Sequence, residues 1–174
     1  MKATGIIRRI DELGRIVIPK EIRKKLKINE GENIEIYIDE EEKIILKKYS
    51  NVKNIKDFVQ TFIDSIYSSY KYNIVVTDTD KVIAAVGNNK KELINKEISN
   101  NLIKCIKDRI SINDKNILKI TEDFEIDCYY NINLINVNGD INGLVIFYNE
   151  EEIKDIDTKI FNISSSFLSK YLED

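Results

Sequence analysis

Residues 1–27 read MKATGIIRRIDELGRIVIPKEIRKKLK, and their charge sets them apart from the rest of the chain. They hold nine Lys and Arg residues against three Asp and Glu residues, a net charge of +6. Because the whole chain carries −3, residues 28–174 carry −9. A phosphate backbone selects such local positive density through the release of condensed counterions. The stretch therefore indicates a DNA-binding surface, with an ordinary solvated charged face as the alternative.

The first 50 residues predict short strands, one short helix and a hairpin. The runs 6–10 and 15–18 are β-like and are separated by a loop in which Gly14 can take the positive φ of a tight reversal. Pro19 suits the first turn of a helix over residues 20–27, because its missing N–H has no intrahelical partner there. Alternating isoleucines in residues 34–38, followed by apolar residues at 44 and 46, predict a hairpin with one buried face.

This first unit contains too little apolar material for a core of its own. A segment of about 50 residues with thin strands and one short helix is marginal as a monomer. We therefore expect obligate oligomerisation of the N-terminal unit, with packing against its own second domain as the alternative.

From residue 55 the apolar period becomes helical, and a second domain is expected over residues 54–174. The pattern predicts a helix over 55–70, strands at 73–77 and 82–86, helical stretches across 90–110, a hairpin of 128–137 with 143–148, and a last helix with a stripe from 153 to 171. Glu150, Glu151 and Glu152 suit the N-terminus of that last helix electrostatically. An antiparallel sheet with flanking helices makes the fold class α+β. The stripes on the first and last helices pack either within the chain or between subunits.

Several classes of protein are excluded by what the sequence lacks. There is no His, no nucleophile elbow and no phosphate-binding glycine loop, so we expect no enzyme activity. Cys105 and Cys128 lack metal-ligand spacing, so both are interpreted as core residues, with no metal and no cofactor. No apolar run approaches the roughly 18 residues of a membrane span, and no secretory signal is present, so we expect a cytoplasmic protein. Tyr129, Tyr130 and Phe147 either line a pocket or belong to the core.

The string TGIIRRIDELGRIVIPKEIRKKLKINEGENIEIYIDEEEKIILKKY, residues 4–49, resembles the DNA-binding domain of the AbrB family of bacterial transition-state regulators. The shared elements are the 5–11 strand, the 11–15 loop, Val17-Ile18-Pro19, the helix from Glu21 to Leu26 and the 44–49 strand. The resemblance implies a swapped-hairpin (looped-hinge helix) domain over residues 1–53, in which the hairpins of two subunits interleave. Residues 54–174 more weakly resemble a GAF module, as in two-domain sporulation regulators of this family, including a helix start at Lys90-Lys91.

The resemblance also implies which side chains face DNA. The matching positions are Arg8 on the first strand, Arg15 on the loop, and Arg23 and Lys24 on the short helix, with Arg9 as a neighbour. Lys24 neutralises phosphate but lacks the planar fork with which Arg contacts guanine. For Arg15, the alternative is an ordinary surface ion pair with Glu12.

The function implied is that of a sequence-specific transcriptional regulator of forespore-stage genes. Its partners would be double-stranded DNA, a second copy through the swapped hairpins, and a homotetramer through the C-terminal helices, with a dimer as the alternative. A small-molecule ligand of the GAF-like domain and association with the nucleoid are also implied. A ligand-sensing or protein-binding scaffold is the alternative function, although the concentrated positive charge argues against it. An antitoxin shares the N-terminal pattern, but antitoxins typically carry a disordered tail, whereas this C-terminal region is periodic.

Overall fold

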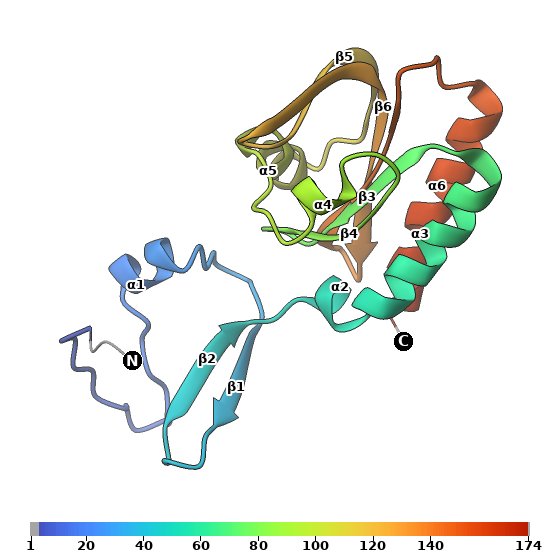
Figure 1. Ribbon diagram of the computed structural model, residues 1–174. Helices are drawn as coiled ribbons and strands as arrows, with labels where there is room; N and C mark the ends of the chain where they lie inside the picture. Colours follow the sequence, from blue (N-terminus) through green and yellow to red (C-terminus); the bar gives the residue numbers. More distant parts are fainter. Residues whose placement is uncertain (1–3, 174) are drawn as a thin grey trace. The chain divides into compact units, whose positions relative to one another are not determined.

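A computed structural model describes residues 4–173, which divide into two units. The first unit ends at Tyr49 and the second begins at Ser50. The first consists of a short helix and a hairpin, and the second of a sheet with helices on both faces (Figure 1). The α+β prediction is therefore confirmed.

The N-terminal unit contains the helix and hairpin that the sequence predicts. Helix α1 spans Lys20–Lys25, directly after Pro19. Strands β1 (Ile34–Ile38) and β2 (Ile44–Lys48) pair in antiparallel register. Asp39 holds the turn between them, because its Oδ1 accepts hydrogen bonds from the N–H groups of Glu41 at 3.0 Å and Lys43 at 2.8 Å.

The expected strands 6–10 and 15–18 are not strands in this structure, which contains one chain. Backbone hydrogen bonds close the loop between them, from Asp11 N–H to the Arg15 carbonyl at 3.0 Å and from Gly14 N–H to the Asp11 carbonyl at 2.9 Å. Within residues 4–173 neither run pairs with another strand, and a strand is stabilised only by a ladder with a neighbour. The apolar side chains of both runs consequently lie in solvent.

The hairpin likewise has no buried face within one chain. Ile36 and Ile38 are 67% and 77% exposed, and Ile7 in the first run is 88% exposed. Among residues 4–49, only Pro19 is buried. The prediction of too little core is confirmed, whereas the prediction of a buried hairpin face is wrong for the isolated chain.

The C-terminal unit is built on a five-stranded antiparallel sheet in the order β4-β3-β7-β6-β5. The strands are β3 (Asn73–Thr77), β4 (Val82–Val86), β5 (Ile112–Thr121), β6 (Phe124–Val137) and β7 (Asp140–Asn149). Strands β3 and β4 lie where the sequence predicts them, and β6 and β7 form the expected long hairpin. Strand β5 was not predicted.

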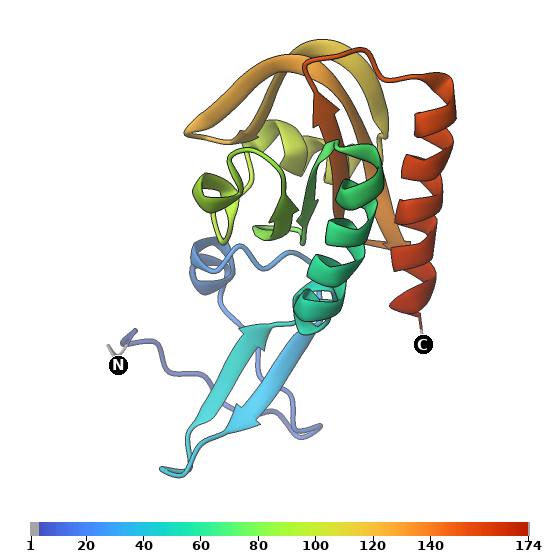
Figure 2. The same cartoon turned by 45° about the vertical axis from the view of Figure 1, so that its right-hand side comes forward.

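Helices cover both faces of this sheet (Figure 2). Helices α3 (Lys56–Tyr70) and α6 (Asp155–Tyr171) lie side by side on one face, and the short helix α2 (Asn51–Asn54) precedes α3. Helices α4 (Lys90–Leu93) and α5 (Asn100–Asp108) contribute to the apolar core on the other face. Within residues 4–173, no helix is both long enough and apolar enough to cross a lipid bilayer.

The sheet separates two apolar clusters. One lies under α3 and α6 and includes Val59, Ile63, Phe161 and Leu168, all fully buried. The other lies under α4 and α5 and includes Leu93 and Leu102. Helix α6 begins at Asp155, so the acidic residues of its first turn are Asp155 and Asp157 and not the expected Glu150–Glu152.

A buried hydrogen bond ties the start of β3 to the start of α6. The hydroxyl of Tyr72, which precedes β3, donates to Asp157 Oδ2 at 2.7 Å, and both side chains are buried. The Tyr72 ring also packs edge-on against Phe161, with 5.1 Å between ring centroids. Burial and the neighbouring carboxylate raise the pKa of Tyr72 to about 12.

We expect Tyr72→Phe to lower the free energy of unfolding in urea by about 1–3 kcal/mol, because it leaves the buried Asp157 carboxylate without this donor. The pKa of Tyr72 in the folded chain, about 12, lies above the ordinary 10.0, so this stabilisation is complete below pH 10 and is lost as pH rises through 12. The variant should therefore lose less stability across that interval. Tyr129→Phe is the control, since the Tyr129 hydroxyl has no hydrogen bond within residues 4–173. Equal losses in both variants would contradict the assignment.

Candidate nucleic-acid interface

The five cations expected to face DNA come from three segments of the N-terminal unit. Arg8 and Arg9 lie in the extended segment before the loop, Arg15 ends the loop, and Arg23 and Lys24 lie on α1. Arg23 is half-buried and the other four are exposed. All five side chains are cations without an acceptor group, so they cannot bond to one another, and four of them are open to solvent in the single chain.

A single carboxylate organises the loop that carries Arg15. Asp11 Oδ1 accepts hydrogen bonds from the N–H groups of Leu13 at 3.0 Å and Arg15 at 2.8 Å. Gly14, between them, has a φ of 75°, which is the left-handed conformation that glycine adopts without strain. Hydrogen bonds from the backbone and then the side chain of Arg15 lower the pKa of Asp11, so its carboxylate is ionised at neutral pH.

The Arg15 side chain pairs with this same carboxylate and not with Glu12. Its Nε donates to Asp11 Oδ2 at 2.7 Å, while the Arg15 side chain stays 70% exposed. The two terminal guanidinium nitrogens make no further hydrogen bond within the described part of the chain. An exposed ion pair of this kind contributes little net energy. The loop therefore orders Arg15 while leaving most of its guanidinium available to a phosphate or a base edge.

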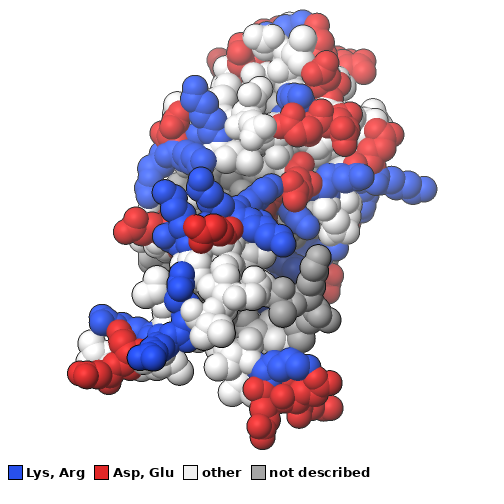
Figure 3. Space-filling view, turned by 90° about the vertical axis from the view of Figure 1, so that its left-hand side faces the viewer, with Lys and Arg blue, Asp and Glu red and all other residues white. Residues whose placement is uncertain are grey.

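Helix α1 and the turn of the β1–β2 hairpin carry charges of opposite sign. Helix α1 carries Arg23, Lys24 and Lys25 in its last turn, where the helix dipole favours cations, and has no buried residue. The turn of the β1–β2 hairpin, residues 39–43, instead has four acidic residues and one lysine. These acidic side chains form the red group at the lower end of Figure 3. The hairpin turn is therefore an unsuitable surface for a polyanion, and α1 and the 11–15 loop are the better candidates.

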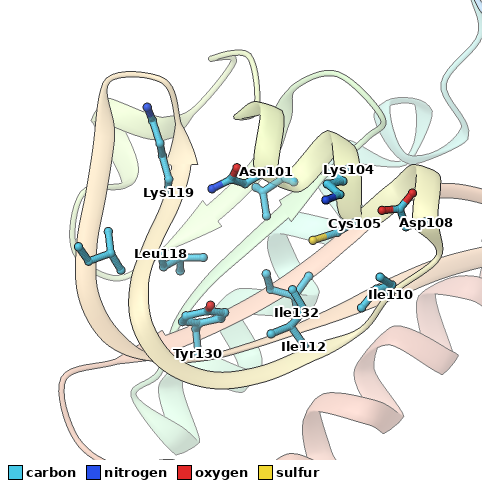
Figure 4. A pocket seen from close by; sticks show the side chains of 12 residues that line it. Asn101, Lys104, Cys105, Asp108, Ile110, Ile112, Leu118, Lys119, Tyr130 and Ile132 are labelled. Carbon is cyan, nitrogen blue, oxygen red and sulfur yellow. The ribbon is translucent and has the colours of Figure 1, made fainter.

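A cavity of about 320 Å³ lies in the C-terminal unit between α5 and strands β5 and β6 (Figure 4). Its lining is mostly apolar, and Asn101, Lys104 and Asp108 line its α5 side. The other lining residues are Leu102, Cys105, Ile110, Ile112, Ile117, Leu118, Lys119, Tyr130 and Ile132. A mainly apolar concavity with a few polar groups is typical of small-molecule sites.

Of the three aromatic residues that the sequence suggested for a pocket, only one lines this cavity. Tyr130 lines it, but Tyr129 does not, and Phe147 is buried on the other face of the sheet, where it stacks on Phe161 at 3.9 Å between centroids. The cavity was missed because β5 supplies part of its wall and four of the first five residues of β5 are polar. Such a strand lacks the alternation of apolar and polar residues by which a half-buried strand is recognised in a sequence.

Both cysteines are buried, and neither forms a disulfide. Burial raises the pKa of Cys128 to about 11 and also raises that of Cys105, so both thiols are protonated at neutral pH. This agrees with their interpretation as core residues, although Cys105 also lines the cavity.

Comparisons with known proteins match each unit and the whole chain. Residues 54–173 match the family described as "Stage V sporulation protein T C-terminal, transcription factor". Residues 7–54 match the family described as "Antidote-toxin recognition MazE, bacterial antitoxin". The chain is 38% identical to stage V sporulation protein T of Bacillus subtilis over 177 residues, which covers 99% of both proteins.

Two further similarities concern single units. Over 49 residues, the chain is 63% identical to the transition state regulatory protein AbrB of Bacillus subtilis, a match that covers 28% of this chain and 50% of AbrB. The C-terminal unit has the fold of the cofactor-binding GAF domain of the nutrient sensor CodY from Clostridium difficile, with a TM-score of 0.53, 16% identity, and coverage of 65% of this chain and 83% of that one. Since the transcription-factor family accounts for most of the chain and the whole-length relative carries the same name, the chain belongs to the stage V sporulation protein T family of transcription factors, with an AbrB-type N-terminal domain.

Proposed function

We propose that this transcription factor regulates forespore-stage genes by binding double-stranded DNA as a symmetric oligomer. The contacts come from five side chains of each N-terminal unit: Arg8, Arg9, Arg15, Arg23 and Lys24. Bound in this way, the protein would be associated with the nucleoid. The observation that carries the proposal is the exposed Arg15 guanidinium on a loop that the Asp11 carboxylate orders.

The five cations divide into two kinds of contact. Lys24 supplies a point charge that suits phosphate, whereas each arginine has a planar fork that also fits the O6 and N7 edge of guanine. Arg15 is the best candidate for reading bases, because its backbone is held by two hydrogen bonds and little order must be gained on binding. The other four would mainly set the position of the protein on the phosphate backbone.

A second copy of the chain is the partner that the N-terminal unit requires. Its exposed apolar side chains occur in both 6–10 and 15–18 and on one side of the hairpin. Covering a single isoleucine or leucine side chain fully is worth about 1.5–3 kcal/mol. Interleaved hairpins from two copies would give residues 6–10 and 15–18 the strand partners that they lack in one chain.

Helices α3 and α6 supply a second self-association surface. Their aromatic rings stack within the chain, with Phe58 and Tyr171 at 4.0 Å and Phe62 and Phe167 at 5.0 Å between centroids. The stripe is thus partly intrachain core, but Phe167 and Tyr171 remain more than one-third exposed and Ile163 is 66% exposed. Pairing of these outer faces would join two dimers into a homotetramer.

The cavity between α5 and β5 is the proposed site of a small-molecule signal. Its volume of about 320 Å³ lies at the lower end of the range for ligand pockets. An apolar wall with Lys104 and Asp108 on one side suits a compact ligand with an apolar body and a charged end.

We expect the intact protein to bind an AT-rich duplex with an affinity that falls steeply as salt rises, measured by fluorescence anisotropy over a salt series. Arg15→Ala and Arg23→Ala should each weaken binding. Arg23→Ala should also reduce the log–log salt slope by about 1 for each phosphate contact that is lost, whereas Arg15→Ala, which removes a base contact, should change the slope less. Lys107→Ala, which removes an exposed cation from α5, is the matched control and should leave the slope unchanged. Salt-insensitive or absent binding would overturn the proposal and favour a scaffold.

A pair of variants at Asp11 separates loop order from charge. Asp11→Asn and Asp11→Ala remove the same negative charge, but Asn keeps an oxygen that can accept the N–H groups of Leu13 and Arg15. If the ordered loop presents Arg15, the Ala variant should bind DNA several-fold more weakly than the Asn variant in the same titration. Equal affinities would show that the carboxylate acts only through its charge.

Sedimentation equilibrium should give a mass of four times the 20.3 kDa chain. Ile38→Asp, which places a charge on the exposed hairpin face, should impair N-terminal pairing, and Ile163→Asp should reduce the tetramer to a dimer. Ile117→Asp is the control, because Ile117 is similarly exposed but lies on β5. A concentration-independent monomer of the native protein would refute both surfaces.

A further inference from the structure

The chain passes from one unit to the other without a free residue between them. Tyr49, the last residue of the N-terminal unit, donates its N–H to the Asn33 carbonyl of the same unit at 3.0 Å. Ser50, the next residue, is bonded to the C-terminal unit through its side chain. The freedom of the connection is therefore confined to the few backbone bonds around the Tyr49–Ser50 peptide, which we call the joint.

The Ser50 hydroxyl makes two hydrogen bonds at once. It accepts from the N–H of Lys53 at 3.2 Å, as the N-cap of α2, and donates to Asp78 Oδ2 at 3.1 Å. The next two residues are also held, because Asn51 Nδ2 donates to Asn142 Oδ1 at 3.1 Å and Val52 is fully buried. Three consecutive residues after the joint are thus fixed to the body of the C-terminal unit.

Asp78 connects this anchor to the sheet. Its side chain is buried, and its Oδ1 accepts from the N–H groups of Asp80 at 2.7 Å and Lys81 at 2.6 Å, which shapes the β3–β4 turn. The same turn accepts a hydrogen bond from Ile98 N–H to the Asp80 carbonyl at 2.9 Å. Ile98 precedes Ser99, the N-cap of the cavity-lining helix α5. The β3–β4 turn is therefore bonded both to Ser50 at the joint and to the residue before the α5 cap.

We propose that Ser50 and Asp78 are positioning residues that keep the connection between the two units short, so that little chain has to be ordered when the DNA-binding units of an oligomer bind DNA together. This inference rests on the proposed DNA binding by the N-terminal unit. A connection that is ordered before binding loses less conformational entropy when several contacts form together. Loosening the joint should lower DNA affinity without removing any phosphate contact.

The chain offers a matched control for this idea. Ser99 caps α5 as Ser50 caps α2, and its Oγ accepts from Leu102 N–H at 3.3 Å and donates to the Lys119 carbonyl at 2.6 Å. Ser50→Ala and Ser99→Ala therefore each remove an N-cap and one further side-chain hydrogen bond from the same unit. Only Ser50→Ala removes hydrogen bonds of a residue at the joint, because the bond from Ile98 to the β3–β4 turn is made by backbone atoms that Ser99→Ala leaves in place.

The test combines hydrogen–deuterium exchange with anisotropy titration of the full chain against an AT-rich duplex over a salt series. Ser50→Ala should speed amide exchange in residues 50–54 and weaken DNA binding by about threefold to tenfold at an unchanged salt slope. Ser50→Thr, which keeps the hydroxyl, should restore both properties. Ser99→Ala should speed exchange at the start of α5 and leave DNA affinity as in the native protein. Asp78→Asn is a second variant of the same bond. Its amide oxygen can keep accepting from the N–H groups of Asp80 and Lys81, whereas the amide nitrogen at the Oδ2 position cannot accept from the Ser50 hydroxyl, so this variant should act in the same direction as Ser50→Ala.

Three results would overturn the inference. These are unchanged exchange at 50–54 in Ser50→Ala, faster exchange with unchanged DNA affinity, and an equal loss of DNA affinity in Ser99→Ala. Each requires a native protein that binds DNA with a steep salt dependence. A native protein without such binding would instead refute the proposed function, so the two failures are distinguishable.

Discussion

The N-terminal unit cannot bury its apolar side chains within one chain, and the rest of the molecule is organised around this constraint. Among residues 4–49 only Pro19 is buried, while Val17 and several isoleucines from two extended runs and a hairpin lie in solvent. Solvent exposure of so much apolar surface is costly in a unit of this size. We therefore expect oligomerisation to be a condition of folding for this unit, and we propose that it brings together basic surfaces that a single chain presents separately.

Local order in this protein depends repeatedly on aspartates that accept hydrogen bonds from the backbone just after them. Asp11 and Asp39 each accept from the N–H groups two and four residues later, and Asp78 accepts from those two and three residues later. Each carboxylate replaces solvent for two amides in a segment with few apolar contacts, and so fixes a turn without a core. In this way Asp11 orders Arg15, and Asp78 holds Ser50.

Sequence periodicity predicted most of the C-terminal unit because its elements bury one face against their own chain. Strands at 73–77 and 82–86 and the helix beginning near residue 55 agree with the structure for that reason. Strand β5 escaped prediction because its first half is polar and exposed, so pairing with β6, and not burial, defines it. The runs 6–10 and 15–18 have strand-like sequences, but neither finds a strand partner within residues 4–173 of the single chain. In the candidate DNA site, the cations could be selected from sequence, whereas the pairing of Arg15 with Asp11 in place of Glu12 follows from the loop geometry around Gly14.

The C-terminal sheet has an exposed apolar helix surface on one face and a cavity on the other. Helices α3 and α6 cover one face and leave an aromatic and aliphatic stripe exposed, whereas α5 lies over the other face beside a mostly apolar cavity. Association through the first face therefore leaves the cavity unobstructed by the same contacts. The chain leaves this unit at Ser50, which is bonded to the β3–β4 turn, and that turn also binds the residue before the α5 cap. Because the bond from Ile98 to this turn is made by backbone atoms, the contact does not depend on the Ser99 cap, and Ser50 keeps its own hydrogen bond to Asp78.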